Sequence, residues 1–79
     1  MAWHVCEVMK AGPSEDGTIY IALRDVGGAF SSRWFVAMNP VKKEILATAL
    51  TAMSTGLTVD TSLSDTAEYS TLNRIYVRR

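Results

Sequence analysis

The sequence predicts a mainly β domain with a single helix, and three observations support this fold class. Only residues 39–56 combine a helical spacing of apolar side chains with residues that start and stop helices. Five other stretches show the apolar alternation or the β-branched and aromatic content of strands. Turn-forming residues separate these stretches. The predicted order is therefore three strands, one helix and two strands.

The first predicted strand covers residues 3–9. Residues two apart share a face of a strand, and we expect Cys6 and Val8 to point inward because that leaves Glu7 in water. A dense run of turn formers at residues 11–17 then ends the strand.

The second and third strands are predicted at residues 18–24 and 33–38, joined by a long loop or bulged bend at residues 25–32. The second strand alternates most clearly between apolar and other residues. The third strand has Phe35 and Ala37 on one face and further apolar residues on the other. We therefore expect it to be covered on both sides, by the helix or by a neighbouring subunit.

The helix of residues 39–56 has recognisable ends. Asn39 is a good N-cap, because its side chain can accept a hydrogen bond from a free backbone amide. Pro40 suits the first helical position, where its missing N–H costs nothing. Gly56 suits the left-handed position just past the C-terminus.

The helix has two unlike faces at about 100° per residue. The half that we expect to be buried contains Val41, Ile45, Leu46, Ala49, Leu50, Ala52 and Met53. The opposite half contains Lys43, Glu44, Ala47, Thr48, Thr51, Ser54 and Thr55. From Ala47 onward this half has only small, uncharged side chains, whereas a solvated face usually has more charge. Two interpretations stay open, a solvated face rich in threonine or a contact between copies of the chain.

The last two strands are predicted at residues 57–63 and 72–78, with a polar turn at residues 64–70 between them. Three strands, a helix and two strands in this order (β-β-β-α-β-β) are expected of a five-stranded OB-type barrel. Closing the barrel removes the exposed sheet edges that endanger small β domains. We expect residues 1–79 to form one such domain.

Composition limits the classes of function. The 79 residues have 48% apolar content and a formal net charge of zero, which predicts a folded domain and makes binding to a phosphate backbone unlikely. With a single cysteine there is no internal disulfide, so oligomerisation is a reasonable source of stability for so small a domain. No export signal or membrane span is visible. The chain is expected to be cytosolic as given, or secreted if a leader was removed.

A family resemblance is found in the strand of residues 3–8, the central helix and the segment of residues 49–59. In these stretches and in its order of elements, the chain resembles the OB-fold B subunits of AB5 toxins, of the subtilase-cytotoxin and typhoid-toxin type. In that family the helix runs through a small-residue and glycine turn directly into a strand. The resemblance implies a ring-shaped homopentamer whose helices line a central pore, with glycans bound on the barrel surface. The family's disulfide is missing here because Cys6 is alone, and His4 occupies the position of a glycan-contacting serine.

Aromatic and arginine side chains provide the candidate site. Aromatic rings stack on sugars or on nucleic acid bases, and they are also frequent in protein interfaces. The residues expected at a ligand-binding surface are His4, Tyr20, Arg33 and Tyr76. The residues expected at an oligomer interface are Trp3, Trp34, Ala47, Thr48, Thr51, Ser54 and Thr55. We predict no catalytic residue, no cofactor and no metal ligand.

Two alternatives remain. A single-stranded nucleic-acid-binding barrel requires an open, basic face around Tyr20, Arg24 and Arg33. A small enzyme would use Cys6 as its nucleophile and His4 as its base. The two side chains lie roughly 6–7 Å apart along a strand, so a buried structural cysteine is the favoured interpretation.

Overall fold

The protein, seen in a computed structural model that describes residues 2–79, is a closed barrel of five strands with one α-helix. This confirms the mainly β fold class and the predicted order of elements, and the architecture is consistent with an OB-type barrel. The elements are β1 (Ala2–Pro13), β2 (Ile19–Asp25), β3 (Arg33–Ala37), a 3-10 turn (Asn39–Val41), α1 (Lys42–Thr55), β4 (Val59–Leu63) and β5 (Thr71–Val77).

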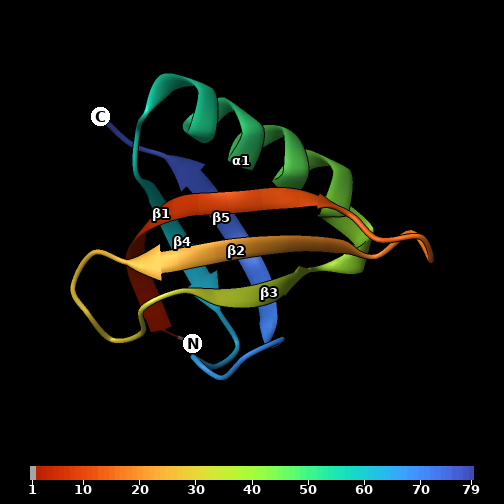
Figure 1. Cartoon of the computed structure of the whole chain (residues 1–79), viewed down its shortest axis with the longest axis horizontal. Coiled ribbons are helices and arrows are strands. Elements are labelled where there is room, and N and C mark those ends of the chain that lie inside the picture. The colour runs from red at the N-terminus through yellow and green to blue at the C-terminus, as the bar shows by residue number, and fades with distance from the viewer. Residues whose placement is uncertain (1) are drawn as a thin grey trace.

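The strands follow one another around the barrel in the order β1-β2-β3-β5-β4. In Figure 1, β1, β2 and β3 run side by side across the front, β4 and β5 cross behind them, and α1 lies beside β1. All neighbouring pairs are antiparallel except β3 and β5, whose parallel pairing is limited to Val36 with Thr71 and Ala37 with Leu72. The weakest seam of the barrel therefore lies between β3 and β5.

The first strand is longer than predicted. It continues through the expected turn to Pro13, because residues 10–13 stay paired with β2. A register shift between Val8 and Lys10 makes Met9 an extra residue. Such a bulge changes which residues point inward. Cys6 is fully buried before it, as predicted, and Ala11 packs against the core after it.

The core fills the barrel and the space under α1. Its largest fully buried side chains are Phe35, Ile21, Leu23, Leu63, Leu72 and Val59. These residues come from four strands. Phe35 and Ala37 on one face of β3 are buried, whereas Trp34 and Val36 on the other face are half-buried, so the expected second cover of this strand is only partial within the single chain. The other strand ends differ from the predictions by one or two residues.

The predicted start of the helix is wrong. Asn39 begins a 3-10 turn that is bonded from Val41 N to Met38 O, and no side chain caps either helix. The chain has to turn away from β3 before α1 can begin, so the cap position falls on Val41. Gly56 ends the helix in the left-handed conformation with φ 70°, as predicted.

Part of the predicted buried face of α1 is also wrong. Ile45, Ala49 and Ala52 are buried, but Leu50 is 48% exposed and Met53 is 42% exposed. The two alanines let α1 lie close to the barrel along a narrow stripe, so the flank with Leu50 and Met53 stays outside. No helix within residues 2–79 has the length and apolar character needed to cross a membrane.

Candidate functional site

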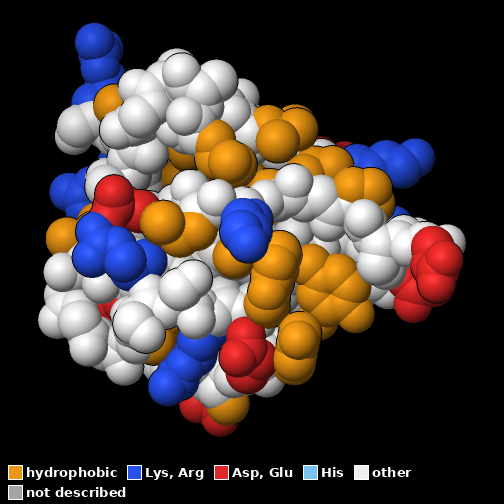
Figure 2. All heavy atoms as spheres, in the orientation of Figure 1, with side chains coloured by type: hydrophobic (Ala, Val, Ile, Leu, Met, Phe, Trp, Pro, Cys, Tyr) orange, Lys and Arg blue, Asp and Glu red, His pale blue; other side chains and the backbone are white. Residues whose placement is uncertain are grey.

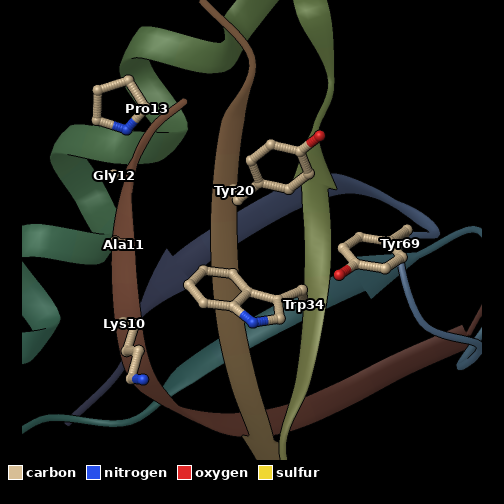
Figure 3. Close-up of a pocket in the computed structure, with 7 residues that line it drawn as sticks. All are labelled: Lys10, Ala11, Gly12, Pro13, Tyr20, Trp34 and Tyr69. Carbon is tan, nitrogen blue, oxygen red and sulfur yellow. The ribbon is translucent and has the colours of Figure 1, made fainter. Parts of the chain in front are cut away.

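A hollow of about 510 Å³ lies on the outer face of β1, β2 and β3. Its lining residues are Lys10, Ala11, Gly12, Pro13, Tyr20, Trp34 and Tyr69. Figure 2 shows hydrophobic side chains gathered over β2 and β3 on the same face, and Figure 3 shows the lining residues. Three aromatic rings surround this concave surface, and we call it the aromatic hollow.

Strand register explains the depth of the hollow. Residues directly opposite each other on paired strands point to the same face, so one outer row contains Lys10, Ala22 and Trp34. The next row places Gly12 beside Tyr20. Each large ring therefore lies next to a small residue. Ala22 is only 3% exposed although it faces outward, which fits the position of the Trp34 indole across β2 in Figure 3.

The three rings meet at Tyr20. Its ring centroid lies 6.4 Å from that of Trp34 and 6.0 Å from that of Tyr69, with interplanar angles of 88° and 82°. Both contacts have the edge-to-face geometry that aromatic pairs prefer. A planar or ring-shaped ligand can therefore stack on one ring while its edge meets another.

The loop between β4 and β5 holds Trp34 and Tyr69 together. The backbone N–H of Trp34 donates to Glu68 Oε2 at 2.6 Å, and the N–H of Tyr69 donates to the carbonyl of Trp34 at 2.6 Å. Arg33 Nη1 also donates to the carbonyl of Thr66 at 2.7 Å. Consecutive loop residues thus take the place of a paired strand beside this part of β3.

Tyr69 has a strained backbone. Its φ of 66° makes it the only non-glycine residue with positive φ in residues 2–79. A left-handed conformation costs an ordinary residue roughly 1–2 kcal/mol, and such strain often occurs at binding sites. Tyr69 is nevertheless 60% exposed, so its strain is not explained by burial in the core.

The electrostatic setting of the hollow is mild. Lys10 is the only charged residue that lines it. Nearby Arg24 pairs with Glu7, and the guanidinium of Arg33 is bonded to Thr66. The remaining polar groups of the lining side chains are two phenol hydroxyls and one indole N–H. These groups can hydrogen-bond to a ligand rich in hydroxyls, whereas a polyanion would meet one lysine.

The structure does not bring the four predicted ligand residues together. Only Tyr20 lies in the hollow. The Arg33 guanidinium lies 5.9 Å from the ring of Phe30, and Tyr76 stacks on Trp3 in a different part of the barrel. Trp34, which is predicted at an oligomer interface, lines the hollow together with Lys10, Gly12 and Tyr69, which are not among the predicted site residues. The alternation in β2 and β3 could have paired Tyr20 with Trp34. The predicted polar turn at residues 64–70 contains Tyr69, but the sequence does not indicate that this turn bonds to β3.

His4 belongs to a structural cluster. Its side chain is 16% exposed, and its Nδ1 lies 3.4 Å from Oδ2 of the buried Asp25. The Asp25 carboxylate also accepts hydrogen bonds from the backbone N–H groups of Gly27 and Ala29. Burial raises the pKa of Asp25, but these hydrogen bonds and His4 outweigh it and lower the pKa overall. The cluster therefore fixes the start of the loop between β2 and β3.

Cys6 has the environment of a structural thiol. It is fully buried, and its Sγ lies 3.4 Å from Thr61 Oγ1. Burial raises the pKa of the thiol to about 11, whereas a nucleophilic cysteine needs a lowered pKa. Nothing in this geometry favours the Cys6 enzyme alternative. Within residues 2–79, no group of three or more His, Cys, Asp or Glu side chains is arranged to hold a metal ion.

The outer face of α1 contains the residues predicted at an interface. Ala47, Thr51, Ser54 and Thr55 are exposed, and Thr48 is half-buried. The hydroxyl groups donate to carbonyls of their own helix, from Thr48 to Glu44 at 2.9 Å and from Thr51 to Ala47 at 3.0 Å. Ser54 and Thr55 both donate to the carbonyl of Thr51. Because these donors are already satisfied, covering this face would not leave them without partners.

A second aromatic group lies on the outer face of β1, β4 and β5. Trp3 and Tyr76 stack with centroids 5.9 Å apart and an interplanar angle of 19°, and both are more than half exposed. Ser62 on β4, between the two strands, is paired directly with Trp3. It is fully buried although it faces outward with Trp3, and its hydroxyl has no partner. We call this group the Trp3–Tyr76 pair.

Fold and site together define a small OB-type β-barrel with an aromatic hollow on its outer face. Comparison with known protein families, curated proteins and solved structures finds no match. The function is therefore inferred from the geometry of the hollow and from the exposed faces of the barrel.

Proposed function

We propose that the protein is a non-enzymatic barrel that binds carbohydrate in the aromatic hollow and assembles into a ring of identical subunits. The observation that carries the binding part is the meeting of Tyr20, Trp34 and Tyr69 around one hollow. The ring part is supported by the outer face of α1 and by the small size of the domain.

The chemistry of the hollow suits a sugar. A sugar ring has an apolar face of C–H groups and an edge of hydroxyls, and aromatic side chains combine an apolar body with a polar tip. Here the rings stand nearly perpendicular to Tyr20. One ring can therefore support the sugar face while a phenol, the indole N–H or Lys10 meets its hydroxyls.

Single-stranded nucleic acid is the second candidate, because bases also stack on aromatic rings. Such binding needs a positively charged groove that follows the phosphates. The hollow has one lysine, the nearby Arg24 is paired with Glu7, and the chain has a formal net charge of zero. The charge distribution therefore favours sugar over nucleic acid.

Assembly into a ring is supported by two features. A domain of 79 residues buries only about 60% of its unfolded surface, so covering more surface stabilises it. The small residues on the outer face of α1 allow close approach, and their hydroxyls are already bonded within the helix. A ring of five, with α1 lining a pore, is taken from the resemblance to the B subunits of AB5 toxins.

A glycan array with the purified protein tests the binding part. We expect selective binding of sugars without added metal ions. A parallel titration with single-stranded oligonucleotides at low and high salt provides the contrast. Salt-sensitive oligonucleotide binding together with no array signal would replace the sugar proposal with the nucleic-acid one.

Light scattering tests the assembly part. The wild-type chain should show a mass several times the monomer mass of 8.7 kDa. Thr51→Arg places a bulky charge on the outer face of α1 and should lower that mass. Ser31→Arg, in the exposed loop between β2 and β3, is the matched control and should not. A stable monomer at micromolar concentration would refute the ring.

A further inference from the structure

Gly12 is a glycine that its backbone conformation does not require. It lies inside β1, opposite Tyr20 on β2. The glycines with positive φ in the described chain are Gly17, Gly28 and Gly56, and Gly12 is not among them. Another residue could therefore adopt the conformation of Gly12 without the strain of the left-handed region.

The space at Gly12 is also open. A Cβ atom added there would meet no heavy atom within 4 Å. Because Gly12 and Tyr20 are directly paired, this Cβ would point to the outer face, where both residues line the aromatic hollow. Glycine inside a strand weakens it and often marks a place where a ligand approaches the backbone closely.

The position of Gly12 indicates how far the hollow extends. Trp34 lies over the row of Lys10 and Ala22, and Gly12 lies in the next row beside Tyr20. Neighbouring rows on one face are roughly 6–7 Å apart, so a ligand that contacts both Trp34 and the backbone of Gly12 extends along the strands. The volume of about 510 Å³ lies in the range that small organic ligands occupy.

We propose that Gly12 is the specificity-determining residue that admits a second sugar unit, so that the hollow binds a disaccharide or longer glycan. This rests on the proposed carbohydrate binding. One unit contacts Trp34 above Ala22, and the next unit lies over the Gly12 backbone against Tyr20. A methyl group at residue 12 occupies the space of the second unit and leaves the first unit in place.

The first test needs no ligand. Gly12→Ala should raise the melting temperature by roughly 2–6 °C, because alanine restricts the unfolded chain and meets no atom in the folded one. A lowered melting temperature would show that glycine is needed for folding, and this result would overturn the proposal.

The second test measures affinity for two probes, the terminal disaccharide and the terminal monosaccharide of the strongest array glycan. Wild type should bind the disaccharide more tightly. Gly12→Ala should weaken disaccharide binding about tenfold and leave monosaccharide binding unchanged, and Gly12→Leu should reduce the disaccharide to the affinity of the monosaccharide. Trp3→Ala, outside the hollow, should change neither affinity.

The outcomes separate the two proposals. Equal affinity of wild type and Gly12→Ala for the disaccharide would overturn the role of Gly12 while carbohydrate binding stands. A wild-type chain that binds no array glycan would contradict carbohydrate binding itself, and the role of Gly12 with it. Oligonucleotide binding that Gly12→Ala weakens would assign the same space to a nucleic acid and overturn the sugar.

Discussion

The two aromatic groups of this barrel are made of the same residue types but have different shapes. The rings of Tyr20, Trp34 and Tyr69 surround a hollow on β1, β2 and β3, and they meet edge to face. Trp3 and Tyr76 lie nearly parallel on the outer face of β1, β4 and β5 and are more than half exposed. One group is concave, and the other is an exposed stack.

The residues between the rings account for this difference. Gly12 leaves open space beside Tyr20, because a Cβ atom there would meet no heavy atom within 4 Å. In contrast, Trp3 and Tyr76 are paired with Ser62 and Asp60, which both have side chains, and Ser62 is completely covered. Aromatic content alone therefore does not identify a binding site, because the size of the neighbouring residues decides whether a ligand has room.

The largest difference in sugar affinity is expected between substitutions of the two tryptophans. Trp34→Ala should weaken sugar binding at least about 30-fold, because an aromatic anchor in a recognition site is worth about 2 kcal/mol or more. Trp3→Ala should leave the affinity per subunit unchanged. Isothermal titration with the strongest array glycan measures both. Similar losses in the two variants would remove the distinction between the hollow and the Trp3–Tyr76 pair.

Assembly of the ring should depend on Trp3 and not on Trp34, the reverse of sugar binding. Trp3 is predicted at an oligomer interface, so Trp3→Ser should shift the dissociation of the ring to roughly tenfold higher concentration. Trp34 is predicted at the same interface from the sequence, but it lines the aromatic hollow, so we expect that Trp34→Ser, the matched change, does not shift the dissociation. Sedimentation of both variants over a concentration series gives the midpoints. If only Trp34→Ser dissociates the ring, the roles of the two groups are reversed.

A smaller effect on sugar binding is expected when a contact of the loop beside the hollow is removed. Glu68→Ala removes the acceptor of the Trp34 N–H and should lower the free energy of unfolding by about 1 kcal/mol. It should also weaken sugar binding a few-fold, because Tyr69 follows directly in the chain. Glu15→Ala, in the exposed hairpin between β1 and β2, is the control for loss of a carboxylate. Urea unfolding and titration of both variants check this, and equal stability would contradict a role for Glu68 in holding the loop.

Substitution of Asp25 is expected to have the smallest effect on either aromatic group. Its pKa is lowered in the folded state, so it contributes stability above its unfolded pKa of about 3.9, and this stability is lost as the pH falls through the folded pKa. Asp25→Asn should therefore reduce the acid dependence of unfolding below about pH 4 and leave sugar binding at neutral pH unchanged. Melting curves from pH 2 to 7 test this. An unchanged acid dependence would show that Asp25 does not stabilise the loop.

The fold could be predicted from the sequence because its signals are local. The alternation of apolar side chains in residues 18–24 predicts a strand, and the glycine at residue 56 predicts the end of the helix. Each signal involves only a few neighbouring residues. The bulge at Met9 has no such signal, and it changed the direction of the β1 side chains that follow it. The exposure of Leu50 and Met53 depends on how closely α1 approaches the barrel, which helical spacing does not determine.

The site was harder to predict because it depends on register. Tyr20, predicted at a ligand-binding surface, lines the hollow, but its neighbours Gly12 and Trp34 come from other strands, and their pairing is fixed only in the closed barrel. Tyr69 reaches the hollow from a loop that is bonded to β3. His4 was selected from the family resemblance, whereas in the structure it packs against Asp25.

The most direct test of the account is an NMR titration that follows the indole N–H signals of the two tryptophans while the array glycan is added. The account predicts that the Trp34 signal shifts and saturates with the ligand, and that the Trp3 signal stays in place. A saturating shift of Trp3 with no change at Trp34 would contradict it, because the sugar would then bind outside the aromatic hollow.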